Sequence, residues 1–367
     1  MEEIEETEAD KYNNIIIVNE DGLDNCLVGF DDEEEPKEVF PPIINYYRYK
    51  YKSTKDSDRA KDPKFQEKLN KCINQFKLEE SLKSLNLTEE ALKSLNINLT
   101  KENDNTEKDE DEIEIINKVK SISPFDEFGN IQNWDDINFL WEKIFTQKLG
   151  VSPEKYNVLL TEGINNKREN REKMAQIMFE TFHVPNLYIA KKLVLPIYSK
   201  FKLSGLMIYF GNDKITIAPV FEGFCLHPVE TFEIPLYSPF FAPNIIDKCA
   251  ECIRSFDFDI RKELTNCMYL YGTPSKIQRI SEQISHKFYY MYGDSTKTKG
   301  ISEQFTQIMK GLIPSCYEYV NVSVLPEKGF PIWEGAKNIS NMLSENNWIS
   351  RNEYEEFGSV VVHRKFF

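Results

Sequence analysis

The architecture of this chain is indicated most directly by two neighbouring segments, Leu159-Leu-Thr-Glu162 and Asn170-Arg-Glu-Lys-Met-Ala-Gln-Ile-Met-Phe-Glu-Thr-Phe182. The first closes a short apolar run of the kind that predicts a buried strand. The second repeats apolar side chains at the spacing of one helix face. These side chains are Met174, Ile177, Met178 and Phe182. A strand followed by a helix is the repeating unit of α/β folds, so we expect that class here.

Further elements are predicted on both sides of these segments. The β-branched run Ile15-Ile-Ile-Val18 and the apolar run Cys26-Leu-Val-Gly-Phe30 flank an Asp-Gly pair and predict a β-hairpin. The segment from Gly205 to Pro219 contains Gly-Asn-Asp and predicts a second hairpin. Asn133 precedes Trp-Asp-Asp and predicts the capped start of a helix. The order of these elements is typical of a mixed α/β fold.

The composition changes between residues 46 and 121. Lys, Asn, Glu and Ser dominate this stretch, and residues 101–114 are almost continuously charged. Such a stretch cannot bury enough apolar surface to offset the loss of chain entropy, so we expect a low-complexity insertion without a core. The segment Glu79-Glu-Ser-Leu-Lys-Ser-Leu-Asn-Leu is nearly repeated as Glu89-Glu-Ala-Leu-Lys-Ser-Leu-Asn-Ile, which indicates short helical segments but too few copies for a solenoid.

Charge and length exclude several classes of protein. The 367 residues carry 60 acidic and 45 basic side chains, a formal charge of −15, which disfavours nucleic acid as a partner. No run approaches the roughly 20 apolar residues that span a bilayer. The first ten residues hold six acids and no base, unlike a secretory or organellar leader, and the seven scattered cysteines suit reduced thiols. We therefore expect a cytoplasmic protein.

Several segments, in this order along the chain, resemble the actin family. The two segments quoted first are similar to actins at almost every position. The resemblance implies an actin-like α/β fold of two lobes with a duplicated ribonuclease-H-like core, and ATP or ADP held with Mg or Ca between them by two hairpin loops. The other segments that carry it are Val39-Phe-Pro-Pro-Ile43, Asn133-Trp-Asp-Asp-Ile137, Asp259-Ile-Arg-Lys-Glu-Leu264, Trp348-Ile-Ser-Arg-Asn-Glu-Tyr354 and Val362-His-Arg-Lys-Phe-Phe367.

The resemblance also implies a domain organisation. Both outer subdomains of actins are expected to be replaced or reduced, because the insertion follows Ile43 and only a few dozen residues separate Gly223 from Asp259. We expect an acidic N-terminal arm at residues 1–14, a first lobe at 15–198 containing the insertion 46–121, a second lobe at 199–325, and a C-terminal return to the first lobe at 326–367.

The nucleotide loops depart from the actin pattern. Actins supply Asp, Gly, Ser, Gly and Lys in the first loop, whereas this chain has Leu23 and Asp24 there and Leu27 at the lysine position. In the second loop Tyr209 and Phe210 add bulk beside one remaining glycine. We therefore expect nucleotide binding to be weak or lost, and hydrolysis impaired. By resemblance Gln176 is the catalytic, water-orienting residue, and the cofactor-binding positions are Glu20, Gly22, Gly211, Asn212, Gly272 and Thr273.

The resemblance further implies surfaces for protein partners. Actins receive amphipathic helices in a groove, and its counterparts here are Tyr198, Ile339, Met342 and Phe367. We expect a divergent cytoskeletal protein that acts mainly by binding cytoskeletal or actin-binding proteins, or actin itself. Two alternatives remain open: an ATP-binding, filament-forming actin with slow hydrolysis, and a fixed subunit of a larger complex. The pair Cys249 and Cys252 lacks a second Cys/His pair, so no metal site is predicted.

Overall fold

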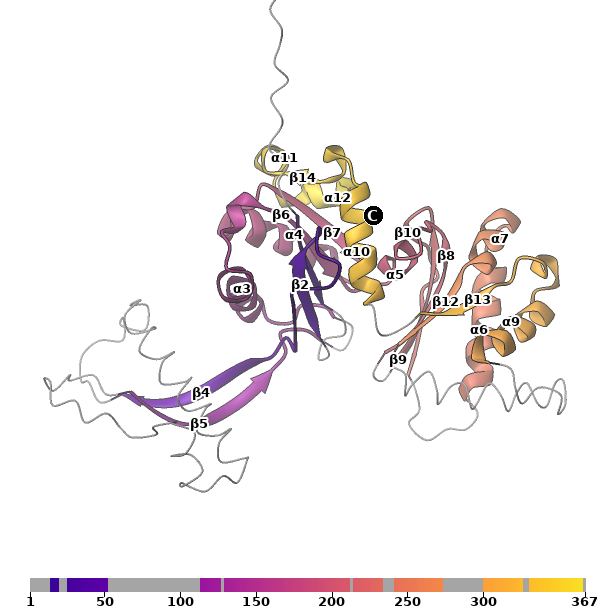
Figure 1. Ribbon diagram of the computed structural model, residues 1–367, viewed down its shortest axis with the longest axis horizontal. Coiled ribbons are helices and arrows are strands. Elements are labelled where there is room, and N and C mark those ends of the chain that lie inside the picture. The colour runs from indigo at the N-terminus through magenta and orange to yellow at the C-terminus, as the bar shows by residue number, and fades with distance from the viewer. Residues whose placement is uncertain are drawn as a thin grey trace, which may run out of the picture. The chain divides into compact units, whose positions relative to one another are not determined.

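The structure is a computed structural model that describes residues 14–19, 25–51, 113–126, 129–211, 214–233, 241–272, 300–325 and 330–365 (Figure 1). The chain divides into two compact units. The larger unit comprises residues 1–42 and 123–367, and the smaller comprises residues 43–122. Of the predicted positions, Glu20, Gly22, Asn212, Thr273 and Phe367 lie outside the described residues.

The first sheet of the larger unit has the strand order β14-β7-β6-β1-β2-β3. Strands β1 and β2 form the predicted hairpin, with Ile15 opposite Phe30, and β1, β6 and β7 run parallel. All six residues of β1 are buried, as expected for a β-branched strand covered on both faces. The strands are β1 (Asn14–Asn19), β2 (Cys26–Phe30), β3 (Glu38–Phe40), β6 (Asn157–Glu162), β7 (Asn186–Lys191) and β14 (Ile349–Ser350).

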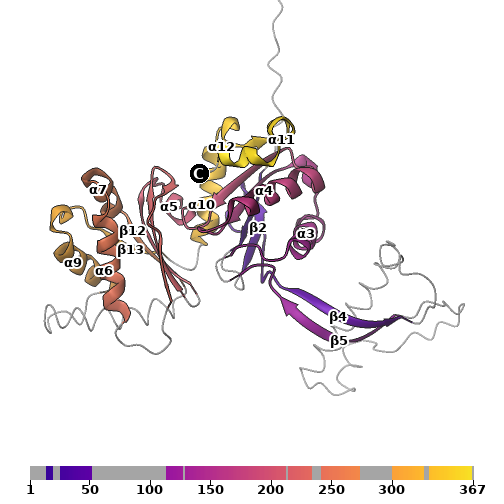
Figure 2. The same ribbon diagram turned by 180° about the vertical axis from the view of Figure 1, so that it is seen from behind.

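Two helices of this half begin near the predicted places. The side chain of Asn133 accepts hydrogen bonds from the backbone N–H groups of Asp135 and Asp136, which confirms the predicted cap of α3. Helices α3 and α4 each continue as a π-helical turn, at Ile144–Leu149 and Ile177–Thr181. Helices α4 and α12 pack together beside α11 (Figure 2). The helices are α3 (Trp134–Lys143), α4 (Arg168–Gln176), α5 (Leu195–Tyr198), α10 (Pro331–Met342), α11 (Arg351–Phe357) and α12 (Val362–Lys365).

The second sheet has the strand order β10-β9-β8-β12-β13, and β11 pairs with β9. Strands β8 and β9 form the second predicted hairpin. Helices α6 and α9 contribute Ile246, Cys249, Phe305 and Ile308 to a core on this sheet. The elements are β8 (Gly205–Phe210), β9 (Lys214–Phe221), β10 (Phe224–Cys225), β11 (Glu230–Glu233), β12 (Met268–Gly272), β13 (Val322–Val324), α6 (Phe241–Arg254), α7 (Phe258–Asn266) and α9 (Ile301–Leu312).

Helix α10 connects the two sheets through one hydrophobic cluster. Its Trp333 is almost completely buried, in a cluster that includes Leu27 of the first sheet and Met207 of the second. Gly335 lets α10 approach α5 closely, because a Cβ at this position would lie 1.8 Å from the backbone oxygen of Leu195. This packing follows from the helical spacing of apolar residues in α10.

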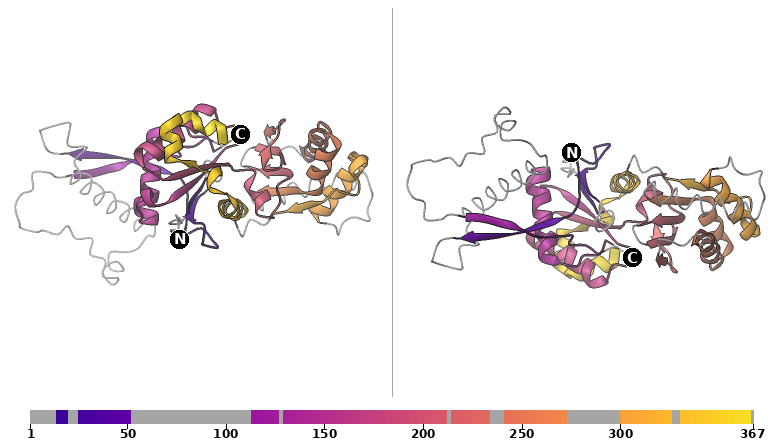
Figure 3. Two further views of the ribbon diagram at one scale, coloured as in Figure 1. Left: turned by 90° about the horizontal axis from the view of Figure 1, so that it is seen from above. Right: turned by 90° about the horizontal axis from the view of Figure 1, so that it is seen from below.

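The smaller unit contains two strands that were not predicted at the ends of the insertion. Strands β4 (Ile44–Tyr51) and β5 (Ile113–Ile122) pair antiparallel, so both ends of the predicted low-complexity stretch are strands (Figure 3). Their Tyr, Ile and Val content favours extended backbone, which the overall polarity of the stretch obscured. The duplicated Leu segments lie outside the described residues. No helix of the described ranges is long and apolar enough to cross a membrane.

Candidate functional site

Two of the predicted cofactor positions meet at one edge of the second sheet. Strands β8 and β12 are parallel, and Phe210 lies opposite Gly272, so Gly211 directly follows at the carboxyl edge. The N–H of Gly211 donates to the carbonyl oxygen of Lys214 at 2.9 Å. A Cβ on Gly272 would lie 2.6 Å from the carbonyl oxygen of Phe210, so only glycine fits there. The structure thus brings Gly211 and Gly272 together.

Aromatic rings and a buried cation occupy the same neighbourhood. The rings of Tyr209 and Tyr271 lie 5.6 Å apart, and Tyr271 is buried. The Nζ atom of Lys192 lies 5.8 Å from the centre of the Tyr209 ring, and the lysine is only 4% exposed. Its backbone N–H donates to the carbonyl oxygen of Glu162 at 3.0 Å. Sequence reasoning missed Lys192, although two lysines within an apolar run were a usable signal.

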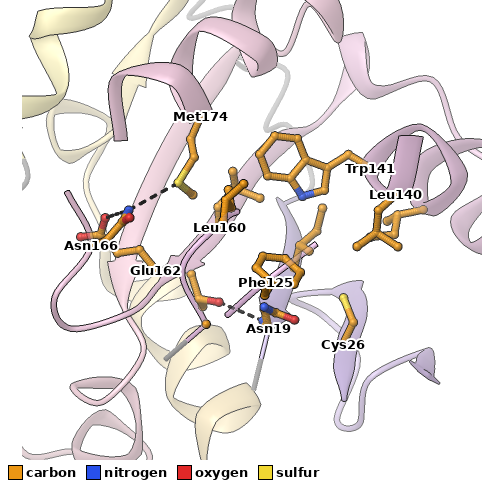
Figure 4. A pocket seen from close by; sticks show the side chains of 14 residues that line it. Asn19, Cys26, Phe125, Leu140, Trp141, Leu160, Glu162, Asn166 and Met174 are labelled. Atoms are coloured by element: carbon orange, nitrogen blue, oxygen red, sulfur yellow. Dashed lines mark hydrogen bonds between the residues drawn. The ribbon is translucent and has the colours of Figure 1, made fainter. Parts of the chain in front are cut away.

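A small pocket opens at the carboxyl end of β1 (Figure 4). The backbone N–H of Asn19 donates to Thr161 Oγ1 at 2.9 Å, and the Asn19 side chain is 7% exposed. Within the described part of the chain, neither polar atom of that amide has a hydrogen-bond partner. The cavity holds about 20 Å³, with largely apolar walls that include Trp141 and Leu160. This is room for about one water molecule.

The carboxylate of Glu162, which lines this pocket, is already bound by other side chains. Glu162 is 4% exposed and forms an ion pair with Arg171, whose Nε donates to Glu162 Oε2 at 3.0 Å. The amide of Asn166 donates to the same oxygen at 3.0 Å (Figure 4). Because two donors hold this oxygen, Glu162 is a structural anion that fixes α4 against β6.

The structure does not bring the predicted catalytic Gln176 to this pocket. Its side chain accepts a hydrogen bond from Lys173 Nζ at 2.8 Å and donates to Glu180 Oε2 at 3.0 Å, so it lies along its own helix. Hydrogen bonds from Tyr354 and Gln176 lower the pKa of Glu180, which reinforces this arrangement. The sequence match at Gln176 therefore reflects a helix surface, and the prediction of a water-orienting role gains no support from its placement.

The predicted partner groove is partly assembled. Tyr198 and Ile339 line one pocket of about 60 Å³, which we call the α5–α10 groove. Gly223 has φ of +84°, a conformation that favours glycine, and a Cβ there would lie 2.3 Å from the Tyr198 hydroxyl. Burial raises the pKa of Tyr198. The remaining lining residues are Glu162, Tyr188, Ile189, Ala190, Lys191, Val194, Leu195, Phe224, Cys225 and Lys365.

Phe224 lines this groove, and further exposed apolar side chains lie on segments that adjoin α5 and α10. Met342 ends α10 and is 62% exposed, and Phe224 is 51% exposed. The loop between α5 and β8 adds Phe201, 78% exposed, and Leu203, whose carbonyl oxygen accepts from the Gly223 N–H at 2.7 Å. Sequence reasoning missed Phe201, Leu203 and Phe224, because an exposed apolar residue is not distinguished from a core residue until burial is known.

The comparison with protein families decides the relationship. The family described as Actin matches residues 10–236, more than half of the chain. The chain belongs to the actin family. The match and the mixed sheets with their helices together establish an actin-like α/β fold.

Actins generally bind a nucleotide with a divalent cation. Within the described ranges, no three His, Cys, Asp or Glu side chains form a group that could hold a metal ion. Leu27, at the lysine position of actins, is fully buried in the hydrophobic cluster. Burial raises the pKa of Cys252 to about 12 and raises that of Cys249 as well, so these thiols stay protonated.

Proposed function

We propose that this member of the actin family acts by binding another protein through the α5–α10 groove, and that its nucleotide chemistry is impaired. The observation that carries the proposal is the exposed apolar side chain of Phe224 in the lining of the groove, with further exposed apolar side chains, Phe201, Leu203 and Met342, on segments adjoining α5 and α10. Large apolar side chains gathered at one concave site mark interaction surfaces more often than isolated ones do. As part of the same proposal, the protein is located in the cytoplasm and associates with the cytoskeleton.

Backbone geometry supports a preformed surface. Phe201 has φ of +52°, a conformation that bulky residues rarely adopt, and it projects a ring that is 78% exposed. Strained residues of this kind persist where the surroundings hold them, and they gather at binding sites. The amide of Asn338 donates to the carbonyl oxygen of Tyr198 at 3.0 Å and fixes α10 against α5. A groove with fixed walls suits the apolar face of an amphipathic helix.

Impaired nucleotide chemistry is supported by the residues at the edge of the second sheet where Gly211 and Gly272 lie. Tyr209 and Tyr271 place two phenol rings beside Gly211 and Gly272, where a phosphate cradle needs open space and backbone N–H groups. The Asn19 amide supplies no charge, and its pocket has room for about one water molecule. Lys192 is a cation at this edge, but its Nζ lies over the Tyr209 ring.

The groove is tested with a fluorescent synthetic amphipathic helix that carries Leu at positions i, i+3, i+4 and i+7. Phe224→Glu, at a residue that lines the groove, is expected to weaken binding about tenfold or more, since a charge in an apolar contact costs over about 1.4 kcal/mol. Phe139→Glu is the matched control, because Phe139 is 55% exposed on α3 and does not line the groove. Equal affinity of all variants would contradict groove binding.

The nucleotide part is tested separately by calorimetry with ATP and Mg²⁺. We expect no micromolar affinity and no release of phosphate. Tight binding with phosphate release would instead establish the alternative of a working ATP-dependent actin, and sedimentation after adding salt, Mg²⁺ and ATP would show whether it forms filaments. Stable stoichiometric partners recovered with the full chain would indicate the fixed-subunit alternative.

A further inference from the structure

One lysine that lines the α5–α10 groove, Lys191, differs from the other charged lining residues in its surroundings. Lys191 is the last residue of β7 and is half-buried among the lining residues of the groove. Its charge acts on the thiol of Cys225 in the same wall: burial raises the pKa of Cys225 to about 11, and Lys191 opposes part of that rise. The two side chains therefore face a common space.

The other charges of the groove are already paired. The Nζ atom of Lys365 lies 2.8 Å from Glu353 and also donates to the backbone oxygen of Trp348. Glu162 is held by Arg171. In contrast, Lys191 makes no ion pair within 4 Å with any residue that the structure describes. The groove thus presents a net positive charge in a chain whose formal charge is −15.

We propose that the segment that fills the groove is an amphipathic helix whose apolar face carries one carboxylate, placed to pair with Lys191; this rests on the proposed function of the groove. An occupant that covers Lys191 removes water from its ammonium group. Without a compensating partner that desolvation is costly, whereas a carboxylate at hydrogen-bond distance offsets it. Charge complementarity of this kind selects one partner among similar apolar helices.

The experiment compares three peptides that differ at one position of the apolar face, which carries Glu, Gln or Lys. With the unmodified chain, the Glu peptide is expected to bind about tenfold more tightly than the Gln peptide, and the Lys peptide most weakly. Lys191→Met is expected to abolish the preference for Glu while keeping apolar contact. Lys191→Glu is expected to reverse the order of the Glu and Lys peptides.

Lys200→Glu is the matched control, because Lys200 is exposed just beyond α5 and makes the same change in net charge. It is expected to keep the preference for the Glu peptide. Equal affinity of the three peptides for the unmodified chain would overturn the pairing with Lys191 and leave groove binding intact. If none of the three peptides binds, both proposals are overturned. Circular dichroism of each variant confirms that the fold is retained.

Discussion

Gly335→Ala gives the sharpest test of how α10 is held against α5, because two effects of the substitution have opposite signs. Alanine is the better helix former, and in an open helix the change stabilises by up to about 1 kcal/mol. At Gly335 the new Cβ would lie 1.8 Å from the backbone oxygen of Leu195 and 2.4 Å from its carbonyl carbon. Ordinary contact begins at 3.4 Å, so α10 must move by about 1.6 Å, which is 3.4 minus 1.8.

The magnitude follows from the kind of atoms that meet. Overpacking costs typically 1–3 kcal/mol, and the upper end applies because a backbone carbonyl cannot rotate away as a side chain can. Subtracting the gain in helix propensity leaves a net destabilisation of about 2 kcal/mol. Urea denaturation of the full chain, followed by circular dichroism, measures this difference.

Gly311 provides the matched control, since it is exposed within α9. Gly311→Ala is expected to leave stability unchanged or raise it by up to about 1 kcal/mol. The Gly335 variant should also weaken binding of the amphipathic peptide, because Tyr198 and Ile339 are carried by the two helices that separate. A Gly335→Ala protein as stable as the unmodified chain would refute the close approach of α10 and α5.

Two further predictions concern ion pairs. Glu162→Gln should destabilise the fold by about 3–5 kcal/mol because it leaves the buried guanidinium of Arg171 without its anion, and thermal unfolding of the variant measures this loss. Burial alone would raise the pKa of Glu353, but hydrogen bonds from Lys365 and the Ser350 backbone outweigh it and hold the pKa below its ordinary 4.5. A carboxyl group whose pKa is lowered in the fold stabilises the fold above pH 4.5, and this stabilisation is lost as the pH falls through the folded pKa. The difference in stability between the unmodified chain and Glu353→Gln should therefore shrink on acidification. A difference independent of pH between 3 and 7 would contradict that pairing.

Local patterns predicted much of the fold. Both hairpins, the Asn133 cap and the α4 helix are found as expected, because each depends on side chains close together in the sequence. The strands β4 and β5 were not predicted. Their ladder joins residues more than 60 positions apart, and the pattern of nearby residues does not predict such a distant pairing.

The candidate site was predicted less completely. Tyr198 and Ile339 do meet in one groove, and Gly211 and Gly272 do share one sheet edge. Gln176 matched its expected place in the sequence, yet its side chain bonds to Lys173 and Glu180 on its own helix. A motif specifies which residue stands at a position, whereas the direction of its side chain depends on neighbours that only the folded chain supplies.

The sequence by itself determined the family, both hairpins and the helices α3 and α4, because these follow from residue identity and short-range periodicity. The tertiary structure alone decided which polar groups remain without partners. Lys191 and Lys192 are adjacent in the sequence, but Lys191 lies in a groove and forms no ion pair with the residues that the structure describes, whereas Lys192 is buried beside Tyr209. Lys191 ends β7 and Lys192 begins the turn that follows, so the packing of distant elements around each side chain gives neighbouring lysines different surroundings.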